Sequence, residues 1–276
     1  MIELDSRTLF EKLRRRVTGA PRPISTRYVL FSYPKSGRTW VRFMVDLYLA
    51  RTYNRPVRNV FEVEKDPFVR SRHPILVTHF TFTRNVPYYQ VGRFTQRKTI
   101  VPTSHGVLLT RNLYATLASH FVHMRNRTRQ FDGTPSEFLR HPNLGVLKLI
   151  TFYNFWLTLR AEFASSDVFS YEALKANPAI VFTQVLTSLG ISPVNAQLVD
   201  DVVAKSSFER LQELALAEAY RGTVLAPTVP SNKNSWKVRE GQSRGFRSVF
   251  SEDDLAHIRR LVDDLLIDKS IVDLST

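Results

Sequence analysis

A short loop, residues 33–40, has the composition of an anion-binding site. It reads Tyr-Pro-Lys-Ser-Gly-Arg-Thr-Trp and lies between an apolar run and a helical pattern. Gly37 lets the backbone approach a ligand closely, and Lys35 supplies a mobile positive charge. The hydroxyls of Ser36 and Thr39 add hydrogen-bond donors. The order differs from the nucleotide-triphosphatase loop G-x-x-x-x-G-K-[ST], because here the lysine precedes the glycine. The loop therefore predicts an anion site, and the alternative is an ordinary turn between a strand and a helix.

A second pair of anion-binding side chains follows a later apolar run. Arg111 comes directly after residues 106–110, and Ser119 lies eight residues further on in a helical pattern. An arginine at the carboxyl edge of a sheet and a serine two helical turns later can hold one phosphate. The spacing alone is unspecific. The interpretation is supported by the position of the pair after the first loop in the sequence.

A long polar stretch, residues 220–250, interrupts the pattern of apolar runs near the C-terminal end. It contains several prolines and glycines, and its second half carries Lys237, Arg239, Arg244 and Arg247. A loop of this length inside a compact domain is more often functional than idle. The alternative is a basic surface loop.

A proton acceptor is expected where the second apolar run ends, at His79. The carboxyl ends of parallel strands are where ligands bind in such sheets, so His79 is the preferred general base. Glu62 and Glu64 are the acidic alternatives, and a purely structural histidine is the third. His120 and His123 are expected to be packing or surface groups. No His, Asp or Glu cluster has the spacing of metal ligands, so no metal is expected.

Alternating strand and helix patterns must position these residues. Strands are expected over residues 28–33, 75–79, 106–110 and 168–171. Helices are expected over residues 39–53, 112–124, 144–163, 178–189, 194–204, 207–219 and 252–267, the last with Ser251 as its N-cap. The alternation predicts a single α/β domain, residues 1–276, with a central, mostly parallel sheet flanked by helices. Residues 1–25 are expected to form an N-terminal extension.

Composition narrows the class of protein. The chain has 276 residues, is 43% hydrophobic, and carries a net charge of +14 from 39 Lys and Arg against 25 Asp and Glu. This apolar content rules out disorder as the state of the whole chain. The absence of cysteine excludes disulfide scaffolds, cysteine-ligated metals and thiol catalysis. Residues 1–130 hold 24 basic and 7 acidic side chains, so the partner is expected to be anionic.

Location follows from the same patterns. No run of eighteen apolar residues is present, and the N-terminal segment is a poor secretory signal. A cytoplasmic protein is therefore expected. Residues 9–17 form a short basic amphipathic pattern, which allows a peripheral contact with an anionic membrane surface.

The motifs together resemble a known family, the sulfotransferases that use 3′-phosphoadenosine 5′-phosphosulfate (PAPS). The loop Tyr33–Trp40 is similar to the loop that holds the 5′-phosphosulfate in that family, except that Arg38 stands where a second threonine is common. The resemblance implies a sulfotransferase fold with a P-loop-like turn. It also implies a role in holding the nucleotide for Lys35, Ser36, Gly37, Arg38, Thr39 and Trp40, the last against the adenine.

The other motifs resemble further parts of the family's cofactor site. Arg111 and Ser119 match its 3′-phosphate pair, and residues 238–250 match its R-K-G-x-x-G segment. In that segment Glu240 replaces the usual lysine, and the spacing between the glycines is one residue longer. The resemblance assigns Arg239, Glu240 and Gly241 to the 3′-phosphate. It assigns Tyr171, Ser206 and Phe208 to the surroundings of the adenine.

The resemblance implies transfer of a sulfuryl group from PAPS to a hydroxyl, or less favourably an amine, with adenosine 3′,5′-bisphosphate (PAP) as the product. The segment 77–79 is similar to the family's Lys-Thr-His element with Val77 in place of lysine, which makes His79 the base. Lys35 would stabilise the departing oxygen. A small-molecule, glycan or lipid-like acceptor is expected, and the oligomeric state is left open. The alternatives are a P-loop-type phosphotransferase and a non-catalytic nucleic-acid-binding protein, although no nucleic-acid partner is expected.

Overall fold

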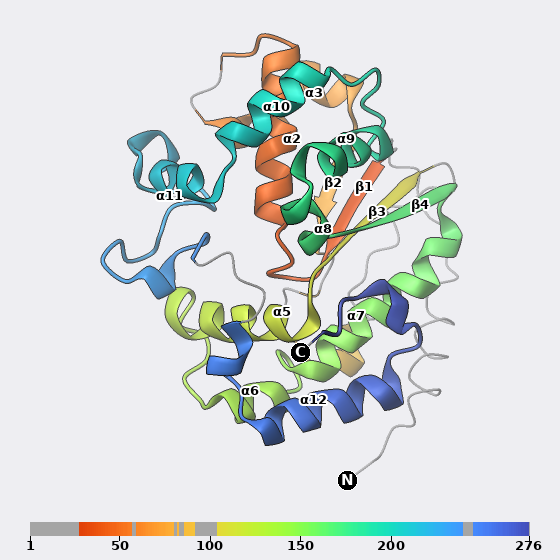
Figure 1. Ribbon diagram of the computed structural model, residues 1–276, viewed down its shortest axis with the longest axis vertical. Helices are drawn as coiled ribbons and strands as arrows, with labels where there is room; N and C mark the ends of the chain where they lie inside the picture. The colour runs from red at the N-terminus through yellow and green to blue at the C-terminus, as the bar shows by residue number, and fades with distance from the viewer. Residues whose placement is uncertain are drawn as a thin grey trace.

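A four-stranded parallel sheet forms the centre of the molecule (Figure 1). The structure is a computed structural model, and it describes residues 28–56, 59–79, 82, 86–91, 104–239 and 245–275. The strand order is β2-β1-β3-β4, and every neighbouring pair is parallel. The strands are β1 (Tyr28–Ser32), β2 (Ile75–Thr78), β3 (His105–Thr110) and β4 (Ser165–Ser170). The predicted α/β domain with a parallel sheet is confirmed.

The two faces of the sheet are covered by different helices (Figure 1). Val29 and Phe31 of β1 pack with one set of helices, whereas Leu30 packs with the other, because successive side chains of a strand point to opposite faces. The first set is α5 (Leu113–Val122), α7 (Val146–Leu159) and α12 (Glu252–Leu265). The second set is α2 (Arg38–Thr52), α9 (Pro178–Ser188) and α10 (Ala196–Lys205).

The strand order creates a crevice at the carboxyl edge of the sheet. The chain passes from β1 to β2 on one side of the sheet and from β3 to β4 on the other side. The connections that leave the neighbouring strands β1 and β3 therefore diverge. In open α/β sheets, ligands bind at such a switch point. The loop after β1 starts at this place and leads directly into α2.

Several strand and helix boundaries differ from the predictions. β4 begins three residues earlier than expected and ends at Ser170, so Tyr171 starts a short helix, α8 (Tyr171–Ala176), capped by the Ser170 side chain. The predicted helix 112–124 is divided: α5 ends at Val122 and a π-helical turn, η4 (His123–Arg127), follows. Three α-helices were not predicted: α3 (Pro67–Arg72), α6 (Pro135–Arg140) and α8. The remaining α-helix is α11 (Phe208–Leu216).

The polar stretch 220–250 is largely irregular, as expected. Its described part contains only short 3₁₀ turns, which are the end of η6 (Glu218–Tyr220), then η7 (Lys233–Ser235) and η8 (Gly245–Ser248). The helix after it begins as predicted, because Ser251 and Asp254 form a capping box. The predicted extension, residues 1–25, lies outside the described residues. No helix in the described part of the chain is long and apolar enough to cross a membrane.

Candidate active site

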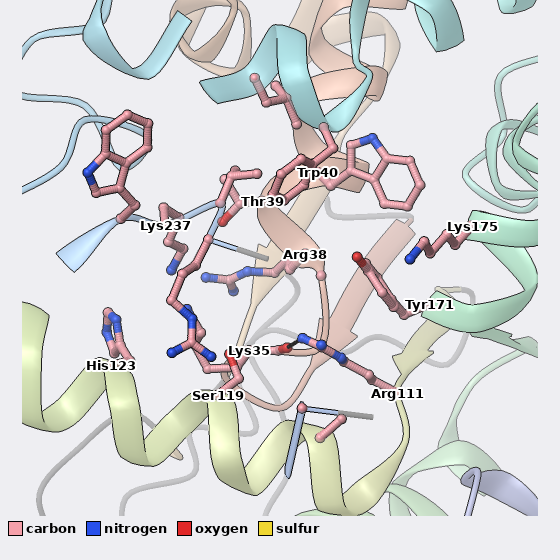
Figure 2. A pocket seen from close by; sticks show the side chains of 18 of the residues that line it. Lys35, Arg38, Thr39, Trp40, Arg111, Ser119, His123, Tyr171, Lys175 and Lys237 are labelled. Carbon is pink, nitrogen blue, oxygen red and sulfur yellow. Dashed lines mark hydrogen bonds between the residues drawn. The ribbon is translucent and has the colours of Figure 1, made fainter. Parts of the chain in front are cut away.

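A cavity of about 480 Å³ lies at the carboxyl edge of the sheet (Figure 2). All four strand ends contribute to its walls. Lys35 and Gly37 follow β1, His79 follows β2, Arg111 follows β3 and Tyr171 follows β4. Parallel strands point their carboxyl ends the same way, so residues far apart in the sequence meet at one edge.

The loop after β1 has a left-handed backbone at two positions. Lys35 has a φ of 76° and Gly37 a φ of 92°, and the Ser36 N–H donates to the Tyr33 carbonyl at 3.3 Å. Such turns make concave backbones that favour anions, and a strained non-glycine residue such as Lys35 is typical of a functional loop. Gly37 is the N-cap of α2 and has no capping side chain, so the first turn of α2 opens toward the cavity without one.

The cavity is strongly electropositive. Six of its described lining residues are Lys or Arg and one is acidic, Glu209. Burial lowers the pKa of Lys35 well below its usual value, and four nearby cations lower it further, namely Lys237, Arg111, Arg127 and Arg239. A bound polyanion relieves this repulsion. Among the described residues no group of three His, Asp or Glu side chains is arranged to hold a metal ion.

Arg111 and Ser119 both line the cavity near the Lys35 loop (Figure 2). The Arg111 guanidinium donates through Nη1 to the Lys35 carbonyl at 3.1 Å, and it lies over the Tyr171 ring at 4.7 Å from the centroid. Ser119 projects from α5 two helical turns after Arg111. These contacts hold the guanidinium against the loop, at the wall of the cavity.

His79 is held in one orientation. Its Nδ1 lies 2.6 Å from the Ser32 carbonyl oxygen, which can only accept, so Nδ1 carries the proton and Nε2 keeps its lone pair. Burial lowers the pKa of His79 well below its usual value, and Arg38 and Lys237 lower it further, although the bond to Ser32 opposes them. His79 is therefore a neutral imidazole at pH 7. Of the acidic alternatives, Glu62 is exposed and bonded to Asn59, away from the cavity lining, and the Glu64 side chain lies outside the described part.

Aromatic side chains form another wall of the cavity. Trp40 and Tyr171 meet edge to face with ring centroids 5.7 Å apart, and Phe208 contributes from the first residue of α11. The Trp40 indole N–H donates to the Ser206 carbonyl at 2.9 Å. The Ser206 hydroxyl donates to the Val203 carbonyl, so its backbone oxygen rather than its hydroxyl fixes the indole.

Two predicted loop residues have different surroundings. Thr39 lines the cavity, whereas Ser36 is fully buried and is not among the lining residues. Burial raises the Tyr153 pKa, and the Ser36 hydroxyl lowers it by a smaller amount. The sequence pattern shows which hydroxyls the loop has, and the turn of the backbone decides which of them faces the ligand.

The irregular segment 224–239 forms the wall opposite the sheet edge. Arg127, at the end of the π turn η4, holds it by donating to three carbonyls: those of Ser235 and Ala226 at 2.8 Å and that of Val224 at 3.2 Å. Lys237 and Arg239 of this segment line the cavity. Glu240 and Gly241, predicted to bind the nucleotide, lie outside the described residues.

Sequence reasoning missed several residues of the cavity wall, and two of them follow predicted site residues at a helical spacing. His123, expected to be a packing or surface group, lines the cavity, and so does Lys175. Each lies four residues after a predicted site residue, Ser119 and Tyr171 respectively, and residues four apart share one face of a helix. That spacing could have identified both residues from the sequence.

Comparisons with known proteins agree with this architecture. A crystal structure of the mouse sulfotransferase SULT7A1 with PAP is similar with a TM-score of 0.63 at 16% identity, covering 95% of this chain and 91% of that one. Retinol dehydratase with androsterone and inactive cofactor PAP gives 0.59 at 13% identity, covering 97% and 87%. Retinol dehydratase with retinol and PAP gives 0.58 at 14% identity, covering 98% and 88%. At these identities the likeness concerns the fold. The sequence pattern that defines the sulfotransferase domain matches residues 25–270, and this chain therefore belongs to the sulfotransferase family.

Proposed function

We propose that this protein transfers a sulfuryl group from PAPS to a hydroxyl of a small-molecule, glycan or lipid-like acceptor. One observation carries the proposal: a histidine whose Nδ1 lies 2.6 Å from the Ser32 carbonyl oxygen lines the same cavity as a lysine with a left-handed backbone and an arginine–serine pair. Sulfuryl transfer needs this combination, because the acceptor must lose a proton while negative charge builds up on the departing oxygen. The known PAP complexes of proteins with this fold support the choice of nucleotide.

The cavity suits a nucleotide with two separate anionic ends. Lys35, Thr39 and the first turn of α2 would hold the 5′-phosphosulfate, and Arg111, Ser119 and Arg239 would hold the 3′-phosphate. The adenine would lie against the aromatic wall formed by Trp40, Tyr171 and Phe208. Residues 220–250 would act as the cofactor-binding loop. Six basic side chains against one acidic residue match a ligand with several negative charges.

The chemical roles follow from protonation states. PAPS, when bound, supplies the sulfuryl group and a phosphate leaving group. His79 accepts the acceptor's proton at Nε2, since the Ser32 carbonyl occupies Nδ1–H and burial keeps the ring neutral. Lys35, at the turn of the loop, stabilises negative charge at the phosphate end as it forms.

The test is sulfuryl transfer from labelled PAPS to a panel of phenols, sugars and sterols, together with PAP binding by calorimetry. His79→Ala should lower kcat by about 100-fold or more while leaving PAP affinity within about threefold. Glu62→Ala is the matched control for the acidic alternative and should retain activity. Lys35→Ala should weaken PAP binding as well as turnover. If Lys35→Ala binds PAP as tightly as the wild type, the loop assignment is wrong.

A further inference from the structure

Trp236 presents a large aromatic side chain to the cavity without belonging to the core. It is partly exposed, and it lines the cavity from the segment 224–239. It is a member of none of the three apolar clusters that the described residues form. Its ring therefore keeps apolar surface that a ligand in the cavity can bury.

Two hydrogen bonds fix the position of this ring. The Trp236 indole N–H donates to the Pro230 carbonyl at 3.0 Å, and Arg127 donates to the carbonyl of the preceding residue, Ser235, at 2.8 Å. Because the indole N–H is used within the segment, the ring offers a ligand its flat apolar face and no polar atom. A ring held in this way loses little conformational freedom when a ligand binds.

The ring lies away from the wall proposed to hold the adenine. Trp236 directly precedes Lys237, and in Figure 2 Lys237 and His123 lie on the opposite side of the cavity from Tyr171 and Lys175. The segment also packs against the π turn η4, which begins at His123. The nucleotide as placed above therefore leaves the Trp236 ring without a ligand.

The proposed base belongs to the same side of the cavity. Lys237 and His120 lower the pKa of both His79 and His123, so the two histidines share their charged and polar surroundings. An acceptor must reach His79 to lose its proton, and the side of the cavity that carries Trp236 is where it has room beside the nucleotide.

The basicity of His79 favours an acidic acceptor hydroxyl. Burial is the largest cause of the low pKa of His79, and a bound nucleotide does not remove it. A weak base accepts a proton more readily from a phenol, whose pKa is about 10, than from an aliphatic alcohol, which is a much weaker acid.

We propose that the acceptor is an aryl alcohol whose ring stacks on the Trp236 indole while its hydroxyl faces His79. This inference rests on the proposed function and specifies its substrate class, with Trp236 as a specificity-determining residue. In the reaction the phenol oxygen bonds to sulfur as the bond from sulfur to the phosphate oxygen breaks. The phenol proton moves to Nε2 of His79, and the electron pair of the broken bond stays on the phosphate of PAP.

The experiment compares two alcohols with the same carbon skeleton, 2-naphthol and its saturated counterpart decahydro-2-naphthol. Binding to PAP-saturated protein is measured for each by calorimetry, with KM where turnover occurs. The wild type should bind 2-naphthol about fivefold more tightly, although the saturated alcohol has at least as much apolar surface to bury. Trp236→Leu should bring this preference to within about twofold, and Trp236→Phe should retain part of it.

Val224→Ala is the matched control, because Val224 is an exposed apolar residue of the same segment that does not line the cavity, and this variant should retain the preference. PAP affinity and melting temperature confirm that each variant is folded.

Equal binding of the two alcohols by the wild type overturns the inference, whatever the variants do. So does an unchanged preference in Trp236→Leu. A loss of PAP affinity in Trp236→Leu as large as its loss of 2-naphthol affinity would assign the indole to the nucleotide and also overturn it. Failure of the wild type to bind PAP would instead overturn the proposed function.

Discussion

The two walls of the cavity are built in different ways. The loop after β1 is continuous with a buried strand, and Tyr33 within it is completely buried in the core. The segment 224–239 has no strand or α-helix and is held by side chains of other elements, Arg127 and Gln212, which donate to its carbonyls. The loop wall is thus fixed by the fold itself, whereas the segment wall is fixed by a few hydrogen bonds and by Leu225, which is buried in a small apolar cluster with Phe43 and Tyr220. Changes in the loop should affect both stability and binding, and changes that release the segment should affect mainly binding.

The largest effect on PAP affinity is expected from Gly37→Ala in the loop wall. Gly37 has a φ of 92°, and an added Cβ would lie 2.6 Å from Cδ2 of Tyr171. Strain of about 1–3 kcal/mol and displacement of the Tyr171 ring should weaken PAP binding roughly 10- to 100-fold in calorimetry and lower the melting temperature. Gly222→Ala is the control, because Gly222 also has a positive φ of 76° but open space around it. Equal loss of PAP affinity in both variants would contradict the proposed fit of the loop against Tyr171.

The next largest effect is expected from Arg127→Ala, which releases the segment wall. Three carbonyls lose their donor, so Lys237 and Arg239 are held less firmly at the cavity, with the Gln212 bonds to the Val238 and Arg239 carbonyls remaining. PAP affinity should fall about tenfold, with little change in the free energy of unfolding. Limited proteolysis should cut within residues 221–239 faster than in the wild type. Arg125→Ala, from the same π turn but exposed, should do neither. A large loss of stability without loss of PAP affinity would mean that the segment does not depend on Arg127.

A smaller effect is expected from pH. Burial, Arg127 and Arg38 lower the pKa of Lys237 to about 8, so part of its charge is lost as the pH rises above that value. A bound anion raises this pKa, and binding therefore takes up a proton. Affinity for PAP should fall by about a few-fold between pH 7 and pH 9. Lys237→Met should reduce the slope, and an unchanged slope would exclude Lys237 as the titrating group.

The smallest effect is expected from Trp40→Phe. The change removes the indole N–H that donates to the Ser206 carbonyl at 2.9 Å but keeps an aromatic ring. The unfolding free energy should fall by about 1 kcal/mol in denaturant titrations, because one hydrogen bond is lost. PAP affinity should change about threefold or less, since aromatic packing persists. A loss of affinity larger than that of Arg127→Ala would reverse the ranking of the two walls.

The contrast between the loop wall and the segment wall also explains which parts of the cavity could be predicted from the sequence. β1, the loop and the start of α2 are consecutive in the sequence. The apolar run, the glycine and the lysine were therefore sufficient to predict them. His79 and Arg111 were found because each ends a strand, and parallel strand ends share an edge. Lys237 was recognised only as a possible source of charge, because its position depends on Arg127, more than a hundred residues away. Whether His123 faces the cavity depends on the register of its helix, and whether Ser36 faces it depends on the turn of the loop. Packing decides both.

The π turn η4 determines where Arg127 points. A π turn contains one residue more than the α-helical turn it replaces, and each helical residue rotates the following side chains by about 100°. Deleting one residue from His123–Arg127 would restore a regular helix and turn Arg127 away from the carbonyls it now holds. A single-residue insertion or deletion in α5 would thus alter a wall formed by a segment about a hundred residues further along the chain. Between relatives with the same fold, differences in this cavity can arise from helical phase alone, with every cavity side chain conserved in type.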